Sequence, residues 1–157
     1  MRFGQMLAAP PGDGNPFDSM LALARASEAI GLDSVWVTDH FMFRNSDKPA
    51  EEVQLLECFV ALGAIAATTS KVKLGSFFAG IPYRNPALLA KMVATLDVIS
   101  HERCIAGLGA GWHEEEFLAY GWPFPPVKER LARLAEAAQI VEKMLTERPA
   151  SFAGDYY

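Results

Sequence analysis

The sequence predicts an α/β fold built on a parallel sheet, and three observations support this class. Short apolar segments alternate with longer amphipathic ones in the order βαβαβαβα. The segments that read as strands begin about 30–40 residues apart, which is the spacing of repeated βαβ units. These strands are nearly continuous apolar runs, as expected where helices cover a parallel sheet. A doubly wound open sheet and a (β/α)8 barrel both fit this pattern.

Four segments have the composition of strands, because they combine β-branched, aromatic and small apolar residues over short runs. The predicted strands span residues 2–7, 34–38, 72–78 and 104–108. We expect them to pair in sequence order through right-handed crossovers, which nearly all βαβ units adopt. Residues 151–157 are predicted to begin a further extended segment.

The predicted helices start and repeat at recognisable positions. Asn-Pro pairs at 15–16 and 85–86 each indicate a helix start, since Asn caps a helix and Pro fits its first position. Apolar residues at helical spacing follow both pairs. The same spacing predicts further helices at 55–68, 114–120 and about 128–145. The polar segment 39–49 is predicted as a loop.

Composition excludes several classes of protein. The 157 residues carry 14 Lys and Arg against 19 Asp and Glu, a net charge of −5, and no basic cluster suits nucleic acid. No apolar run approaches the roughly 18 residues of a membrane span. Cys58 and Cys104 are too few for a disulfide framework or a zinc cluster. We therefore expect a cytoplasmic protein without a nucleic-acid or membrane partner.

The carboxyl ends of the predicted strands are where a parallel sheet places functional groups. Asp39 and His40 follow the second strand, so they could form a proton shuttle or bind a polar cofactor. Alternatively, Asp39 caps a turn and His40 is a hydrogen-bonded structural residue. Phe77 and Phe78 end the third strand between glycines, where a flat ring could approach the backbone, although two core phenylalanines are the simpler account and the one that this pattern alone favours.

A glycine-rich turn, residues 107–111, closes the fourth strand and precedes Trp112 and His113. Its glycines permit a tight turn whose backbone N–H groups could hold phosphate or ring carbonyl oxygens. The turn is not a dinucleotide fingerprint, because Trp112 occupies the place of the third glycine. The turn alone is weak evidence for a binding site.

The remaining polar groups indicate no further site. No metal site is predicted, because the histidines lack ligand spacing on one element: His40, His101 and His113. Residues 114–116 are all Glu and read either as an acid–base cluster or as the acidic first turn of a helix. Arg84 could reach an anion, but a solvated loop arginine is commoner. Glu57 lies among apolar residues and has no evident role.

Taken in order, these motifs resemble the luciferase-like flavin-dependent oxidoreductases, the bacterial luciferase superfamily. The matching segments extend over essentially the whole chain: 31–40, 74–75, 83–91, 96–103, 107–112 and Gly121. The resemblance implies a (β/α)8 TIM barrel of which residues 1–157 hold the first four βα units, the N-terminal part of a larger domain. We therefore do not expect residues 1–157 alone to be a self-sufficient enzyme.

The family binds FMN or coenzyme F-420, an 8-hydroxy-5-deazaflavin, at the carboxyl mouth of the barrel. By resemblance, His40 is the catalytic residue that assists proton transfer. Phe77 and Phe78 match the position where many members have a non-prolyl cis peptide behind the cofactor ring. The cofactor-binding residues that the resemblance implies are Asp39, His40, Phe77, Phe78, Gly109, Ala110, Gly111 and Trp112.

The activity implied is that of an oxidoreductase, of monooxygenase or hydride-transfer type, acting on a small-molecule substrate. A flavin reductase or dehydrogenase would supply reduced cofactor, and the protein would be a homo-oligomer. The Gly-Ala-Gly-Trp loop is closer to the deazaflavin branch, although some deazaflavin-dependent dehydrogenases carry a Glu proton donor at the position of Trp112. The alternative is a non-catalytic flavin-binding or structural remnant of the same fold.

Overall fold

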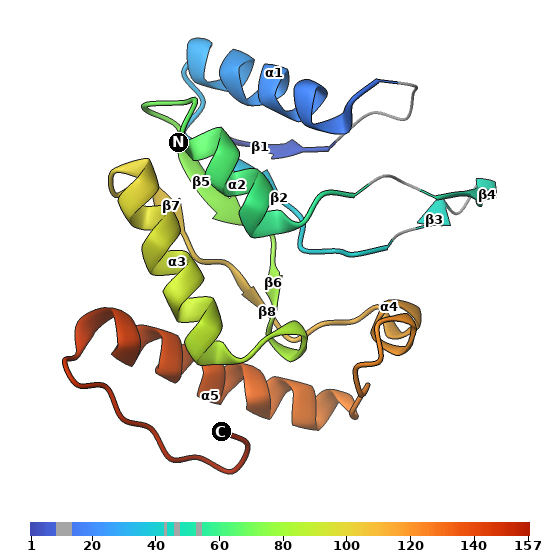
Figure 1. Cartoon of the computed structure of the whole chain (residues 1–157), viewed down its shortest axis with the longest axis vertical. Helices are drawn as coiled ribbons and strands as arrows, with labels where there is room; N and C mark the ends of the chain where they lie inside the picture. The colour runs from blue at the N-terminus through green and yellow to red at the C-terminus, as the bar shows by residue number, and fades with distance from the viewer. Residues whose placement is uncertain (9–13, 43, 46–47, 53–54) are drawn as a thin grey trace.

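A four-stranded parallel sheet lies at the centre of the computed structural model, and helices pack against it (Figure 1). The structure describes residues 1–8, 14–42, 44–45, 48–52 and 55–157, with the backbone alone for 44–45 and 48–52. The strands are β1 (Gly4–Leu7), β2 (Ser34–Val37), β5 (Lys73–Ser76) and β7 (Cys104–Ile105). Their order is β1-β2-β5-β7, and each neighbouring pair is parallel. The predicted fold class and strand order are confirmed.

Helices alternate with these strands, as predicted. They are α1 (Pro16–Ala29), α2 (Cys58–Ala66), the 3₁₀ turn η1 (Ile81–Tyr83), α3 (Pro86–Ser100), α4 (Glu114–Ala119) and α5 (Val127–Thr146). Both Asn-Pro starts are confirmed. The side chain of Asn15 accepts a hydrogen bond from the N–H of Phe17 at 2.9 Å, and that of Asn85 accepts one from Ala87 at 2.8 Å.

The third and fourth predicted strands are each interrupted. Two short strands, β6 (Ala79–Gly80) and β8 (Leu108–Gly109), form a second parallel pair beyond β5 and β7. At the interruption the hydroxyl of Ser76 donates to the carbonyl of Gly107 at 2.9 Å and accepts from its N–H at 3.1 Å. The side chain of Ser76 thus replaces the backbone hydrogen bonds that a continuous pair of strands would make at this point. The pairing of β5 with β7 ends there, and that of β6 with β8 begins beyond it.

The close approach at this interruption requires glycine at position 107. A methyl group there would fall against the carbonyl oxygen of Ser76, nearer than real Cβ atoms come to another atom. We expect Gly107→Ala to lower the free energy of unfolding by about 1–3 kcal/mol, because backbone rather than a flexible side chain would have to move. Urea unfolding measures this effect.

Gly63, within α2, provides the matched control. No heavy atom lies within 4 Å of a Cβ built at Gly63. Gly63→Ala should therefore be neutral, or stabilising by up to about 1 kcal/mol, because Ala is the better helix former. Equal stabilities of the two variants would contradict the close approach seen at Gly107.

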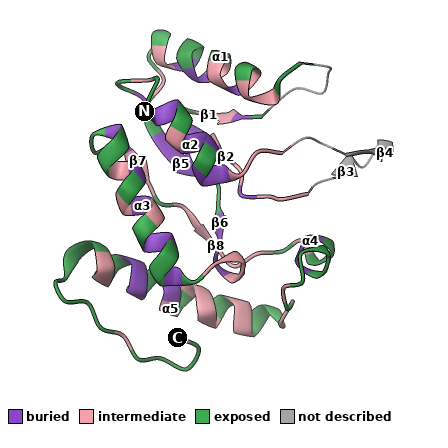
Figure 2. Ribbon diagram, viewed as in Figure 1, coloured by how far each residue is buried: buried purple, intermediate pink, exposed green. Residues whose placement is uncertain are grey.

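The hydrophobic core lies between the sheet and the helices α2 and α3, where Figure 2 shows the buried residues gathered. Leu62 and Ile65 of α2, Leu74 of β5 and Leu89 of α3 are fully buried. Helix α5 packs on α3, on the side away from α2 (Figure 1). This packing fixes the carboxyl ends of the strands relative to one another, and the candidate site lies there.

Two connecting segments differ from the prediction. The segment after β2 contains an antiparallel pair, β3 (Arg44–Asn45) and β4 (Lys48–Glu52), where a loop was predicted, and parts of it lie outside the described residues. Residues 151–157 form no strand; the N–H of Gly154 instead donates to the carbonyl of Tyr157 at 2.9 Å. Across the described ranges, no helix is long and apolar enough to span a membrane.

Candidate active site

A cavity of about 450 Å³ lies at the carboxyl ends of the strands, within the range of about 300–1,000 Å³ usual for small-molecule sites. The structure brings every site residue named from the sequence to its wall: Asp39, His40, Phe77, Phe78, Gly109, Ala110, Gly111 and Trp112. The wall also includes residues that were not named: Met6, Thr38, Gly80 and Tyr83. Residues of β1 and β8 and of the segments that follow β2, β5 and β8 therefore meet at one cavity.

One part of the wall is aromatic. The rings of Phe77 and Phe78 stack with their centroids 4.1 Å apart, and the peptide bond between them is cis. Gly109 lies close against this pair, since a Cβ at that position would be 3.0 Å from the Cβ of Phe78. Among the described residues that line the cavity there is neither Lys nor Arg. The cavity therefore suits a flat, largely uncharged ring better than a phosphate group.

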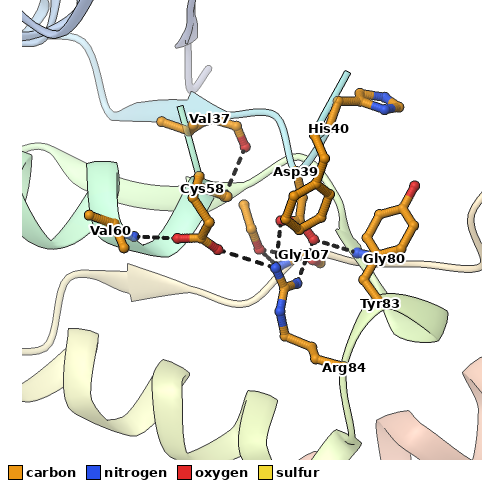
Figure 3. Close-up of polar contacts among 12 residues, drawn as sticks. Val37, Asp39, His40, Cys58, Val60, Gly80, Tyr83, Arg84 and Gly107 are labelled. Carbon is orange, nitrogen blue, oxygen red and sulfur yellow. Dashed lines mark hydrogen bonds and ion pairs between the residues drawn. The ribbon is translucent and has the colours of Figure 1, made fainter. Parts of the chain in front are cut away.

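The carboxylate of Asp39 is buried and bound by the protein itself (Figure 3). Its Oδ2 accepts from the N–H of Gly80 at 2.8 Å and from Arg84 Nη1 at 2.6 Å, and its Oδ1 accepts from Arg84 Nη2 at 2.9 Å. These bonds tie the end of β2 to the segment after β5. Asp39 therefore does more than cap a turn, because it joins two segments of the chain. Its contact with a cofactor stays a prediction.

Arg84 and the partly exposed Glu57 complete this ionic group. Arg84 is not solvated, because its side chain is only 8% exposed, and its Nη2 lies 3.2 Å from Glu57 Oε1. Glu57 is also the N-cap of α2, since its carboxylate accepts from the N–H of Val60 at 2.7 Å. This cap explains the previously unplaced charge and the start of α2 at Cys58. Burial lowers the pKa of Arg84, but Asp39 and Glu57 raise it further, so the guanidinium stays charged.

The carboxylate of Glu116, in α4, is within hydrogen-bond distance of four groups although it is fully buried. Its Oε1 accepts from the N–H of Phe41 and from that of Met42, the latter at 3.1 Å. Its Oε2 accepts from the hydroxyl of Tyr83 and lies 3.1 Å from Nδ1 of His40. The acidic triplet is therefore not only a helix first turn, because its third carboxylate binds the loop that carries His40.

These hydrogen bonds determine the charge of Glu116. Burial raises the pKa of a carboxyl group, but the bonds from Tyr83, Met42, Phe41 and His40 outweigh it, and the pKa of Glu116 lies below its ordinary value. Burial and the hydrogen bond to Glu116 raise the pKa of the Tyr83 hydroxyl. At neutral pH the pair is therefore a carboxylate and a protonated phenol.

His40, His113 and Glu116 could alternatively bind a metal ion. One ligand atom each from His40, His113 and Glu116 lie within 4.8 Å of one another, a grouping that sequence spacing did not reveal. A metal would have to displace hydrogen bonds, however, because both oxygens of Glu116 already accept from protein donors. The hydrogen-bonded arrangement is the better account of this cluster.

Sequence reasoning did not identify Glu116, Tyr83 or Arg84 as parts of the site. Arg84 and Tyr83 follow the third strand, so the strand-end rule could have included them. Glu116 had a weaker signal: it precedes Phe117, an apolar residue in an otherwise acidic turn, which is consistent with an inward face. Nothing in its spacing pointed to a partner 76 positions away.

Comparison with known proteins places this geometry in a family. The chain is 39% identical over 133 residues to an F-420-dependent glucose-6-phosphate dehydrogenase of Kineococcus radiotolerans, covering 83% of this chain and 38% of that protein. The corresponding protein of Amycolatopsis mediterranei is 34% identical over 140 residues, which cover 88% of this chain and 40% of that protein. A solved F-420-dependent secondary alcohol dehydrogenase, in complex with an F-420-acetone adduct, superposes with a TM-score of 0.81 at 29% identity.

That superposition covers 100% of this chain and 46% of the solved one. The chain thus spans less than half the length of each of these three relatives. The pattern of the family described as luciferase-like monooxygenase matches residues 1–157, so the chain belongs to the luciferase-like monooxygenase family.

Proposed function

We propose that the cavity binds the deazaflavin ring of coenzyme F-420 and that the whole protein is an F-420-dependent oxidoreductase of hydride-transfer type. The observation that carries this proposal is the meeting of His40, the Phe77–Phe78 pair and the 109–112 loop at one cavity. The relatives described above, which are named for F-420-dependent dehydrogenation of a sugar phosphate or a secondary alcohol, favour F-420 over FMN.

The residues divide the work between binding and proton handling. When bound, the deazaflavin supplies a two-electron hydride acceptor or donor. Phe77 and Phe78 back the ring on one side, while Gly109, Ala110 and Gly111 let the backbone approach it closely. His40 holds or takes the proton of the substrate hydroxyl as the carbon bearing it is oxidised. We infer that the substrate is a small alcohol or sugar hydroxyl.

Titration of the whole protein with F-420 and, separately, with FMN tests the proposal. We expect saturable binding that is tighter for F-420 than for FMN. The fluorescence of the deazaflavin measures the binding of F-420. Gly109→Val should weaken F-420 binding at least tenfold, because its side chain would displace Phe78 from the wall. Gly63→Ala lies outside the cavity and should bind as the wild type does. Failure of the folded wild type to bind F-420 would exclude this function, as would unchanged binding by Gly109→Val.

A further inference from the structure

We propose that Glu116 is a positioning residue that keeps the proton of neutral His40 on Nδ1, so that Nε2 is the nitrogen that accepts the substrate proton. The inference deepens the proposed function, on which the role of His40 rests. It assigns a task to a buried carboxylate more than seventy positions away from the histidine, in a different βα unit.

The two carboxylate oxygens of Glu116 face different groups. Oε1 faces the backbone N–H groups of Phe41 and Met42, which can only donate. Oε2 faces the hydroxyl of Tyr83 and Nδ1 of His40. A carboxylate that accepts several hydrogen bonds is stabilised in its ionised form, and an ionised carboxylate is only an acceptor.

The contact with Glu116 determines which ring nitrogen of His40 carries the proton. A neutral histidine carries one N–H, and the partner of one ring nitrogen decides which nitrogen that is. The contact of 3.1 Å between Nδ1 and Glu116 Oε2 is a hydrogen bond only if Nδ1 is the donor. In the neutral ring, Nε2 is then the acceptor, which is the state required of a base. The same carboxylate would also stabilise the imidazolium once His40 has taken a proton.

A merely spatial role for Glu116 would depend only on its contact with the Phe41–Met42 loop. The two backbone bonds at Oε1 suffice to hold the Phe41–Met42 loop, and an amide oxygen could replace them. The bond to His40 is different, because it depends on an acceptor at the second position of the side chain. Gln fills the same volume but carries an NH2 group there, so one substitution separates the two roles.

In Glu116→Gln, the N–H groups of Phe41 and Met42 require the amide oxygen on their side, so the NH2 group must face His40 and Tyr83. An NH2 group only donates, and Nδ1 of His40 must then become the acceptor. We expect the neutral ring to change from the Nδ1–H form in the wild type to the Nε2–H form in Glu116→Gln. Heteronuclear NMR of nitrogen-labelled histidine distinguishes the two forms, with His40→Asn identifying the signal.

Two further variants serve as controls. Glu114→Gln removes the same charge from the same helix at an exposed position, and it should leave His40 in the Nδ1–H form. Tyr83→Phe removes a donor to Glu116 while keeping the carboxylate, so it should also leave the Nδ1–H form in place. Tyr83→Phe and the wild type still decide the question if Glu116→Gln does not fold.

The inference is overturned if the neutral ring of His40 has the Nε2–H form in the wild type. It is also overturned if the wild type and folded Glu116→Gln do not differ in the form of this ring. Loss of the Nδ1–H form in Tyr83→Phe would overturn it as well. Because the spectra are recorded without cofactor, they are independent of the binding titration. The expected change of form without F-420 binding would leave the control of the His40 tautomer by Glu116 intact but refute the proposed function and, with it, the role of Nε2 toward a substrate. Binding without that change would refute the tautomer control and leave the proposed function intact.

Discussion

Replacing His40 by Ala is expected to lower the turnover of the whole protein by about a hundredfold to ten-thousandfold, the usual contribution of a positioned acid or base. The dissociation constant of F-420 should change much less, because the imidazole is one contact among the many that line the cavity. An interaction lost only in the transition state lowers kcat rather than binding. The expected result is therefore a separation between kcat and the dissociation constant.

Reduction of F-420 by glucose 6-phosphate or by a secondary alcohol, the substrates named for the relatives, measures this turnover. His101→Asn is the matched control, because His101 is an exposed residue in left-handed conformation after α3, where Asn is well tolerated. A His40→Ala enzyme that turns over like this control would favour the alternative in which His40 is only a hydrogen-bonded structural residue.

Replacing Arg84 by Ala is expected to lower the free energy of unfolding by about 3–5 kcal/mol. The side chains of Arg84 and Asp39 are 8% and 1% exposed, so the substitution would leave the Asp39 carboxylate buried with no cation beside it. Among the described residues, this carboxylate would retain only the N–H of Gly80 as a donor. Denaturant unfolding at neutral pH measures the loss.

Lys143→Ala is the control for this prediction, since Lys143 pairs with Glu147 at 3.4 Å on an exposed face of α5. An exposed pair of this kind contributes about 0–1 kcal/mol. Adding Asp39→Asn to Arg84→Ala should recover part of the lost stability, because it removes the uncompensated charge. A loss at Arg84 no greater than at Lys143 would show that the buried pair contributes little.

The order of strands and helices could be predicted from the sequence because it depends on local patterns. Strand composition, helical spacing and the two Asn-Pro starts each act within a few residues, and they agree with the structure except at residues 151–157, where the predicted extended segment forms no strand. The interruptions after Ser76 and at Gly107 were not predictable in this way, because the side chain of Ser76 bonds to the backbone of Gly107 in another βα unit.

The candidate site likewise contains residues that the sequence could predict and residues that it could not. The strand-end rule was enough to gather His40, Phe77 and the glycine turn, because parallel strands bring their carboxyl ends to one edge. The buried charges were not predictable, since Arg84 bonds to a residue 45 positions away and Glu116 to one 76 positions away. Spacing along one element carries no information about such pairs, and a lone Arg or Glu in a loop reads as solvated.

The buried carboxylates of Asp39 and Glu116 affect how much of the protein is folded. Each of them joins segments from different βα units, so the cavity wall is complete only when all four units have docked. A ligand that binds this wall selects the folded state, and at a hundred times its dissociation constant it adds about 2.7 kcal/mol of stability. With the proposed cofactor, the amount of protein that escapes degradation would follow the supply of F-420 in the cell, so that abundance and cofactor rise and fall together.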